Sequence, residues 1–420
     1  MLNRYIGNKK SILEPIISQV KEKLPNGGRV CDAFSGSLAV SFELKKEGYE
    51  VSTNDINLFS HFYGKHLIEQ CSLPEIELAS FNIDNVDKHI NQAQLILDRG
   101  ISGAEDYSFL RNKKNSHRFQ KLLTVYLYLN NLMDGKPKGN SYFFDTYTEE
   151  GKNSHFESQR GTIGRRKFFT PSNGRRLDLV MNQIRKWNKD GVLEDGYFKY
   201  TLVCSVIDAL EKVSNTQGTY HDFPRDKYDS RAHIPLMLYP PNFDGIISKK
   251  KKHIIGRCED SIEFVSKIPS QDLLYLDPPY NFRQYTSYYF LPNVLCEYID
   301  MDDLKIYFDN VQFVRGQNMT NDFNSSFSKK NEFIKSLYNL VKNCDTKNVL
   351  MSYFDGRNHW NNTADGTDVE GKEVLLKFFN SELFIAGTCD LIPFDRLNYQ
   401  SYGGHKAKFI KEFLFSGVKK

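Results

Sequence analysis

The sequence predicts an α/β fold, and three observations support that prediction. Residues 29–55 alternate a short strand, a turn of small residues, a helix and a second strand. Residues 273–276 form an apolar run typical of a buried parallel strand, and Asp277 follows at its carboxyl end. The runs 253–255 and 347–353 have the same character later in the chain. Because ligands of open α/β sheets bind just beyond the carboxyl ends of the strands, we expect the functional residues there.

The chain begins with a basic segment followed by an amphipathic helix. Residues 10–24 place six apolar side chains on one helical face. Gly7, Lys9 and Lys10 come directly before that face. A glycine and two lysines at a helix N-terminus are able to hold an anion through backbone N–H groups and the helix dipole. A basic arm without a ligand is the alternative interpretation.

The first strand–helix–strand pattern has the plan of a nucleoside-binding unit. One strand ends near Asp32, the turn contains Gly36, and the helix over 38–47 stops at Gly48. Asp55 follows the second strand, 19 residues past Gly36. An acid about 20 residues after such a turn accepts hydrogen bonds from ribose hydroxyls. The turn lacks the full G-x-G-x-x-G pattern, so a nucleoside smaller than a dinucleotide fits better.

The tetrapeptide Asp277-Pro278-Pro279-Tyr280 has the chemistry of a site for an aromatic amine. The two prolines fix φ and supply no backbone donors, so they form a rigid, acceptor-rich slot beside the carboxylate. Asp277 and the Pro278 carbonyl are able to accept both N–H groups of an exocyclic amine such as adenine N6, while Tyr280 stacks on the ring. The alternative is a strand that ends in a proline turn, with Tyr280 packed in the core.

Clear strand patterns stop between residues 62 and 250, where helical patterns alternate with polar loops. Within this region, residues 160–189 hold nine Lys or Arg side chains against one acid, Asp178. Clustered cations beside aromatic residues suit a phosphate backbone, and a solvated basic face is the alternative. The candidate phosphate-binding residues are Arg165, Arg166, Lys167, Arg175 and Arg176.

Composition restricts the class of protein. The net charge is +4 over 420 residues, a mild excess that by itself says little about partners. Seven cysteines stand singly, without C-x-x-C or zinc spacing, so we expect a reducing cytoplasm and no metal. The chain does not open on an apolar signal region, and no run reaches the roughly 18 apolar residues of a membrane span. We therefore expect no membrane association.

Four motifs together resemble those of the Dam-like, alpha-group adenine-N6 DNA methyltransferases, and look most like those of type II and IIS restriction–modification methylases. The motifs are residues 4–10 (RYIGNKK), residues 32–37 (DAFSGS), Asn54-Asp55, and residues 277–285 (DPPYNFRQY). Leu38 stands where the family usually has a second glycine. We expect its side chain to turn into the core at the start of the helix.

The resemblance implies a Rossmann-like class I methyltransferase sheet of seven mostly parallel strands, with an antiparallel last hairpin and helices on both faces. Residues 383–391 and 409–415 are the expected hairpin strands. Residues 1–61 and 251–420 would form the catalytic domain. Residues 62–250 would be an inserted, mainly helical target-recognition domain that binds DNA.

The resemblance also implies a reaction, in which S-adenosylmethionine methylates N6 of an adenine flipped out of duplex DNA. The implied catalytic residues are Asp277, Pro278, Pro279 and Tyr280. The implied cofactor-binding residues are Tyr5, Lys9, Asp32, Phe34, Gly36, Asp55, Asp260 and Asp277. We expect a monomer on double-stranded DNA. It would be the modification half of a restriction–modification system, and its cognate endonuclease would act on the same site without an obligatory complex.

Two alternatives to this reaction stay open. N4-cytosine methylation acts on a similar amine, but those enzymes resemble a motif with serine in place of Asp277. A DNA-binding protein that keeps the fold without the chemistry is the other alternative. The complete Asp-Pro-Pro-Tyr motif argues against it, and Leu38 is the feature in its favour.

Overall fold

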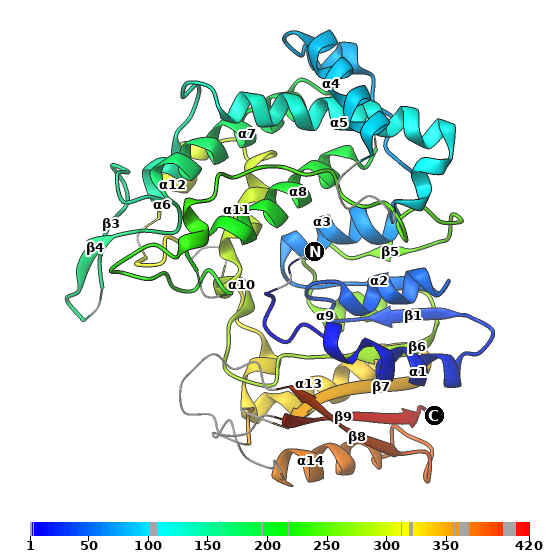
Figure 1. The fold of residues 1–420 in the computed structure, drawn as a ribbon. Coiled ribbons are helices and arrows are strands. Elements are labelled where there is room, and N and C mark those ends of the chain that lie inside the picture. The colour runs from blue at the N-terminus through cyan, green and yellow to red at the C-terminus, as the bar shows by residue number, and fades with distance from the viewer. Residues whose placement is uncertain are drawn as a thin grey trace. The chain divides into compact units, whose positions relative to one another are not determined.

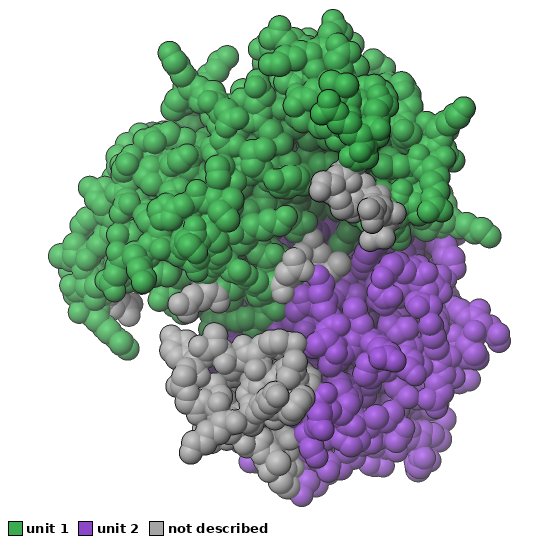
Figure 2. All heavy atoms as spheres, viewed as in Figure 1, with its two compact units in different colours: residues 1–6, 65–250, 286–322 green, residues 7–64, 251–285, 323–420 purple. Residues whose placement is uncertain are grey.

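The computed structural model describes residues 2, 4–100, 107–158, 160–194, 196–216, 218–311, 313–318, 322–355, 358–360, 369–397 and 409–420. The chain divides into two compact units, shown in different colours in Figure 2. Unit 1 comprises Met1–Ile6, Lys65–Lys250 and Thr286–Asp322. Unit 2 comprises Gly7–Gly64, Lys251–Tyr285 and Phe323–Lys420.

Unit 2 contains a seven-stranded sheet with the order β5-β2-β1-β6-β7-β9-β8 (Figure 1). The strands are β1 (Arg29–Asp32), β2 (Glu50–Thr53), β5 (Ile254–Ile255), β6 (Gln271–Leu276), β7 (Thr346–Asp355), β8 (Asp390–Leu397) and β9 (Phe409–Val418). The pairs from β5 across to β7 are parallel, whereas β9 is antiparallel to both β7 and β8. The predicted sheet of seven mostly parallel strands with an antiparallel last hairpin is confirmed.

Strand order reverses between β1 and β6. From β1 the chain moves outward to β2 and β5, then returns to β6 on the other side of β1 and continues to β7. Right-handed crossovers therefore place the helix between β1 and β2 on one face, and those after β5 and β6 on the other. The helices of unit 2 are α1 (Leu13–Lys23), α2 (Ala39–Lys46), α3 (Leu58–Tyr63), α9 (Ser261–Lys267), α13 (Lys330–Asn343) and α14 (Val369–Phe379). This switch point is where such sheets bind ligands.

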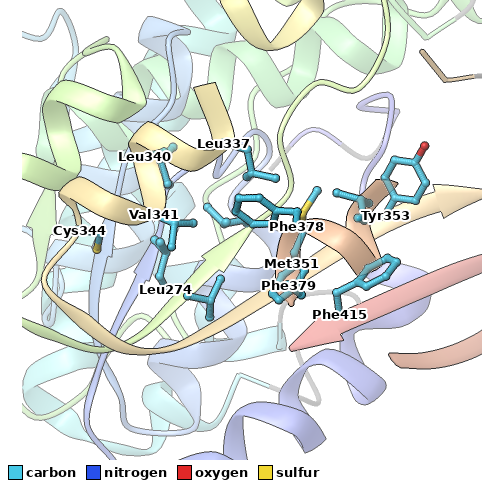
Figure 3. Close-up of a cluster of buried hydrophobic side chains, with 14 of the residues drawn as sticks. Leu274, Leu337, Leu340, Val341, Cys344, Met351, Tyr353, Phe378, Phe379 and Phe415 are labelled. Atoms are coloured by element: carbon cyan, nitrogen blue, oxygen red, sulfur yellow. The ribbon is translucent and has the colours of Figure 1, made fainter. Parts of the chain in front are cut away.

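A continuous apolar core lies between the sheet and the helices α9, α13 and α14 (Figure 3). Helix α13 supplies Phe333, Leu337 and Leu340, whose spacing of four and three residues puts them on one face. They pack with residues of β6, β7, β9 and α14, among them Leu274, Met351, Phe378, Phe379 and Phe415. This packing fixes the strands whose ends carry the site described below.

The strand predicted over residues 383–391 is wrong for most of its length, because β8 begins only at Asp390. The apolar residues Leu383 and Phe384 are buried in the core from a turn instead of a strand. Pro393 lies on β8 at the edge of the sheet, where a missing backbone donor is tolerated.

Unit 1 is mainly helical. Its longer helices are α4 (Val86–Arg99), α5 (Lys113–Met133), α6 (Tyr142–Tyr147), α7 (Pro171–Lys189), α8 (Phe198–Val213), α11 (Phe290–Tyr298) and α12 (Leu304–Asp309). A short antiparallel pair, β3 (His155–Glu157) and β4 (Ile163–Arg165), lies in a region predicted as loop. None of the helices in the described ranges is long and apolar enough to cross a membrane.

The structure assigns two segments differently from the predicted boundaries. Met1–Ile6 and Thr286–Asp322 belong to unit 1, although the sequence analysis grouped them with the catalytic domain. Side chains of α7 hold the second segment, since Arg185 donates to the Tyr298 carbonyl at 2.7 Å and Asn188 to the Ile299 carbonyl at 3.1 Å. The short helix α10 (Tyr285–Tyr288) spans the division between the units.

Candidate active site at the ends of the parallel strands

Asp277 directly follows β6 and lies in a mostly buried polar network. Its Oδ1 is 3.0 Å from Lys9 Nζ and accepts a hydrogen bond of 3.3 Å from the Ser352 hydroxyl on β7. The Tyr275 hydroxyl lies 2.9 Å from the same serine oxygen. The Asp277 side chain is 18% exposed, and no described residue donates to its Oδ2. One carboxylate oxygen is therefore fixed by the protein, and the other is left for a ligand.

Lys9 is a buried cation between two carboxylates. Its Nζ lies 2.7 Å from Glu412 Oε1 on β9 and 3.0 Å from Asp277 Oδ1. The exposed fraction is 4% for the Lys9 side chain and 0% for that of Glu412. Burial alone lowers a lysine pKa, but the two carboxylates outweigh it and hold the pKa of Lys9 well above its usual value. Burial raises the pKa of Asp277 to about 6, with Lys9 opposing that rise and Glu412 adding to it.

Glu412 was not predicted as a site residue. It lies in a predicted strand and belongs to none of the four motifs. Its only sequence signal is an acid next to Lys411 in that predicted strand, whose other residues are apolar. Lys9 was predicted as a cofactor ligand, and the structure places its ammonium group beside the Asp277 carboxylate. Its contact with the cofactor stays a prediction.

Asp55 holds the glycine turn that follows β1. Its Oδ2 accepts a hydrogen bond from the Gly36 amide at 2.9 Å, and its Oδ1 accepts from the amide and side chain of Asn57, both at 2.9 Å. Gly36 has a φ of 47°, the left-handed region that favours glycine. A carboxylate oxygen has two lone pairs, so Asp55 Oδ2 retains capacity for a ribose hydroxyl.

Asp32 provides a buried acceptor at the end of β1. The Ser41 hydroxyl donates to its Oδ2 at 2.6 Å, whereas its buried Oδ1 has no hydrogen-bond partner in the described part of the chain. Burial raises the pKa of Asp32 to about 7, and the Ser41 hydrogen bond opposes that rise. A buried acceptor without a donor is costly and invites a ligand. The ammonium group of S-adenosylmethionine is such a donor, so this site fits the implied cofactor.

Phe34 and Asp260 also lie in unit 2. Phe34, in the same turn as Gly36, packs edge-on against Phe327 with ring centroids 5.0 Å apart. Asp260 precedes α9, and its Oδ1 accepts a hydrogen bond from the Ile262 amide at 2.8 Å. This N-terminal cap explains an acid at Asp260 without any ligand. Cofactor contacts by both residues stay predictions.

The tetrapeptide after β6 divides its side chains between core and site. The Tyr280 ring is 9% exposed, and its centroid lies 5.3 Å from that of Tyr353 and 6.4 Å from that of Phe354. Most of this ring thus belongs to the core, and stacking on a base stays a prediction. No described residue donates a hydrogen bond to the Pro278 carbonyl, which Pro279 follows. That acceptor is available to a ligand.

Tyr5 belongs to unit 1 and not to the cluster around Asp277 in unit 2. Its ring stacks on Tyr289 with centroids 4.5 Å apart, and the Tyr289 hydroxyl accepts a hydrogen bond from the Ile6 amide at 2.7 Å. The predicted role of Tyr5 in cofactor binding stays a prediction. Among the described residues, no group of three or more His, Cys, Asp or Glu side chains could hold a metal ion.

Two of the predicted phosphate-binding arginines are structural. Arg166 is 1% exposed and donates to the carbonyls of Phe313 at 2.7 Å and Asn153 at 2.8 Å. Burial lowers the pKa of Arg166 to about 10. Arg176 is also buried, donates to the Leu236 carbonyl at 2.8 Å and pairs with Asp134. Phosphate contact by these two residues stays a prediction, and it would compete with the hydrogen bonds that their guanidinium groups already donate within the fold.

The other three basic residues reach solvent. Arg165 is exposed on β4, while Lys167 pairs with Glu149 at 3.2 Å. Arg175 pairs with Glu150 at 2.9 Å across an exposed surface. Exposed ion pairs of this kind are weak and exchange readily for other anions. Arg165, Lys167 and Arg175 therefore remain candidates for phosphate contact.

Leu38 adopts a left-handed conformation, with φ 65°, immediately before α2. Its amide donates to the Ser35 carbonyl at 2.7 Å, its carbonyl accepts from Phe42 at 2.8 Å, and its side chain is buried. The expected burial is confirmed. A left-handed leucine costs about 1–2 kcal/mol, and full burial of the side chain, worth about 1.5–3 kcal/mol, offsets that strain.

Because the backbone at Leu38 is strained, we expect glycine to be more stabilising than alanine at this position, the reverse of their usual order in helices. Leu38→Ala removes the packing but keeps a Cβ in the left-handed region, whereas Leu38→Gly removes both. We expect the glycine variant to be more stable than the alanine variant by about 1 kcal/mol in denaturant unfolding, with both less stable than the parent protein. An alanine variant as stable as the glycine variant, or more so, would show that φ at this position is not strained.

Comparison with known proteins agrees with this geometry. Residues 5–349 match the family described as D12 class N6 adenine-specific DNA methyltransferase. Modification methylase StsI of Streptococcus sanguinis is 26% identical over 416 residues, which cover 98% of this chain and 51% of the relative. Type II methyltransferase M.FokI of Planomicrobium okeanokoites is 25% identical over 351 residues, covering 83% of this chain and 44% of the relative.

The chain thus spans about half the length of these curated relatives. The family match extends over most of the chain, from the basic segment before α1 to β7. The chain therefore belongs to the D12 class N6 adenine-specific DNA methyltransferases.

Proposed function

We propose that this protein transfers a methyl group from S-adenosylmethionine to N6 of adenine in duplex DNA, as the modification enzyme of a restriction–modification system. Family membership and the names of the relatives support this reaction. The observation that carries it is Asp277 at the end of β6, held by Lys9 and Ser352, beside a Pro278 carbonyl that no described residue occupies.

Unit 2 offers acceptors for the cofactor at the switch point of its sheet. Asp55 would take the ribose hydroxyls, and Asp32 Oδ1 would take the ammonium group. Asp260, with one oxygen committed to the α9 cap, would offer its other oxygen to the adenine amine. When bound, the cofactor supplies an electrophilic methyl group on a sulfonium, which is a good leaving group.

The chain's own contribution is to orient the target amine. The lone pair of adenine N6 is delocalised into the ring, which makes this nitrogen a poor nucleophile. Asp277 Oδ2 and the Pro278 carbonyl would accept its two N–H groups, draw the nitrogen toward sp³ and aim the lone pair. Positioning of this kind is able to supply most of the acceleration.

The target base must leave the stacked duplex, at a cost of a few kcal/mol. Stacking on Tyr280, worth about 1–3 kcal/mol, would offset part of that cost. Unit 1 would recognise the DNA, with Arg165, Lys167 and Arg175 on its phosphates. We propose a monomer on the duplex that needs no complex with the cognate endonuclease.

The proposed reaction is tested by incubating the protein with radiolabelled S-adenosylmethionine and duplex DNA, then separating the nucleosides of the digested product. We expect label in N6-methyldeoxyadenosine. Label in N4-methyldeoxycytidine would show that the target base is cytosine and not adenine. An unlabelled product over a wide range of DNA sequences would favour a DNA-binding protein without methyltransferase activity.

Replacement of the catalytic carboxylate should abolish transfer. Asp277→Ala removes the acceptor that faces the amine, so we expect turnover to fall by more than about ten-fold while DNA binding is largely kept. Asp390→Ala, which changes an exposed aspartate at the start of β8, is the matched control. If folded Asp277→Ala protein keeps more than a tenth of the parent turnover, Asp277 does not have this role.

The acid after β2 should contribute to cofactor affinity. Asp55→Ala is expected to weaken S-adenosylmethionine binding by about 1.5–3 kcal/mol, the value of hydrogen bonds to a charged group. Calorimetry measures this change, with the exposed Glu263→Ala on α9 as control. Equal affinity of the parent and Asp55→Ala proteins would remove Asp55 from the cofactor site.

The solvent-facing and buried arginines should behave differently in DNA binding. Each neutralised phosphate contributes about 0.9 to the slope of log affinity against log salt. The double variant Arg165→Ala, Arg175→Ala should lower that slope by about 1–2. Arg166→Ala, which removes a buried guanidinium, should instead reduce folding stability by about 3 kcal/mol and leave the slope unchanged. An unaltered slope in the double variant would mean that these side chains form a solvated face.

A further inference from the structure

Glu412 on β9 is a buried carboxylate that forms an ion pair with Lys9. Glu412 is followed on its strand by the core residues Phe413, Leu414 and Phe415, and it is itself fully buried. Taking a carboxylate out of water costs several kcal/mol, and a well-packed apolar side chain in place of a buried ion pair is often as stable or more stable. The fold alone therefore does not call for a charge at this position, and its contact with Lys9 points to the site.

Lys9, Asp277 and Glu412 form a cluster of three charged side chains. Lys9 with Asp277 alone would be a neutral pair, in which the ammonium group is held by the catalytic carboxylate. Glu412 and Asp277 instead share this ammonium group, and the shorter contact, 2.7 Å against 3.0 Å, is the one to Glu412. Lys9 therefore compensates the charge of Asp277, the most exposed of the three side chains, less fully than it would in a pair.

The sharing of Lys9 affects how strongly Asp277 accepts a hydrogen bond from an amine. The charge of Glu412 raises the pKa of Asp277, and that of Lys9 lowers it. A more basic carboxylate is a stronger hydrogen-bond acceptor, and it better stabilises the positive charge that develops on the amine during transfer.

We propose that Glu412 is a positioning residue of the methyl-transfer site: it shares the ammonium group of Lys9 and so keeps Asp277 a strong hydrogen-bond acceptor. This inference rests on the proposed function, and it concerns a residue that acts through Lys9 and does not itself touch the substrate. The other titratable groups whose charges influence Asp277 or are influenced by it are Asp32, Tyr275, Tyr280 and Tyr285. None of them changes in the variants below.

Two substitutions separate charge from shape. Glu412→Gln keeps the size of the side chain and removes its charge, while Glu412→Asp keeps the charge and shortens the side chain. If Glu412 acts through charge, Glu412→Gln loses about ten-fold or more in kcat and Glu412→Asp retains most of it, with KM for DNA unchanged in both. The control is Ser416→Ala, which alters another buried polar side chain of β9 and should keep the parent kcat.

The pH profile of kcat supplies a second readout. Asp277 must be ionised to accept from the amine, so kcat falls as pH drops through its pKa. Removal of the Glu412 charge lowers that pKa, so the acid limb of Glu412→Gln should move to lower pH even though the maximum is reduced. A merely structural role would not shift this limb in that direction.

Three results would overturn the proposal: Glu412→Asp more damaged than Glu412→Gln, an acid limb that stays in place, or a kcat that stays at the parent value. Absence of transfer by the parent protein would refute the proposed function without deciding the role of Glu412. In that case, titration of the Asp277 carboxyl by ¹³C NMR, assigned with Asp277→Asn, decides it. A lower pKa in Glu412→Gln supports the proposal, and an unchanged pKa contradicts it.

Discussion

One ammonium group shared by two carboxylates is the interaction on which the site depends. Lys9, Asp277 and Glu412 come from the beginning, the middle and the end of the chain, and they meet in unit 2 only because β6, β7 and β9 are neighbours in the sheet. Removing Lys9 would leave two carboxylates without the cation that they share, which is strongly destabilising. The apolar packing of α13 and α14 against these strands thus holds the strands that carry this charge cluster.

The proposed cofactor site depends on the same sheet. Asp32 ends β1 and Asp55 follows β2, so the pairing of these parallel strands brings two acids to the turn around Gly36. Asp55 fixes that turn through the Gly36 amide, and the buried Asp32 Oδ1 has no hydrogen-bond donor among the described residues. Leu38 completes the turn in a conformation that normally favours glycine, because its buried side chain offsets the strain.

The features that depend on local sequence pattern were predicted from the sequence. The strand ending at Asp277, the turn with Gly36 and the acid at Asp55 follow from apolar runs, small residues and spacing. The resemblance supplied the number of strands and the antiparallel last hairpin. What was not predicted depends on tertiary contacts. Glu412 resembles any strand acid until the sheet places it on Lys9. Arg166 and Arg165 are adjacent and chemically identical, yet the first is buried among backbone carbonyls and the second is exposed. Similarly, the apolar residues at Leu383 and Phe384 pack in the core from a turn and not from a strand. The strand β8 begins after them and contains a proline.

The most direct measurement is a crystal structure of the protein with S-adenosylmethionine and a duplex that contains its target adenine, identified by sequencing methylated DNA. We expect the adenine outside the helical stack, with N6 within hydrogen-bonding distance of the Asp277 carboxylate and the Pro278 carbonyl. Lys9 should stay between Asp277 and Glu412, and the ribose of the cofactor should lie on Asp55. A target base that remains stacked in the duplex, or an N6 held by acceptors other than Asp277, would contradict this mechanism.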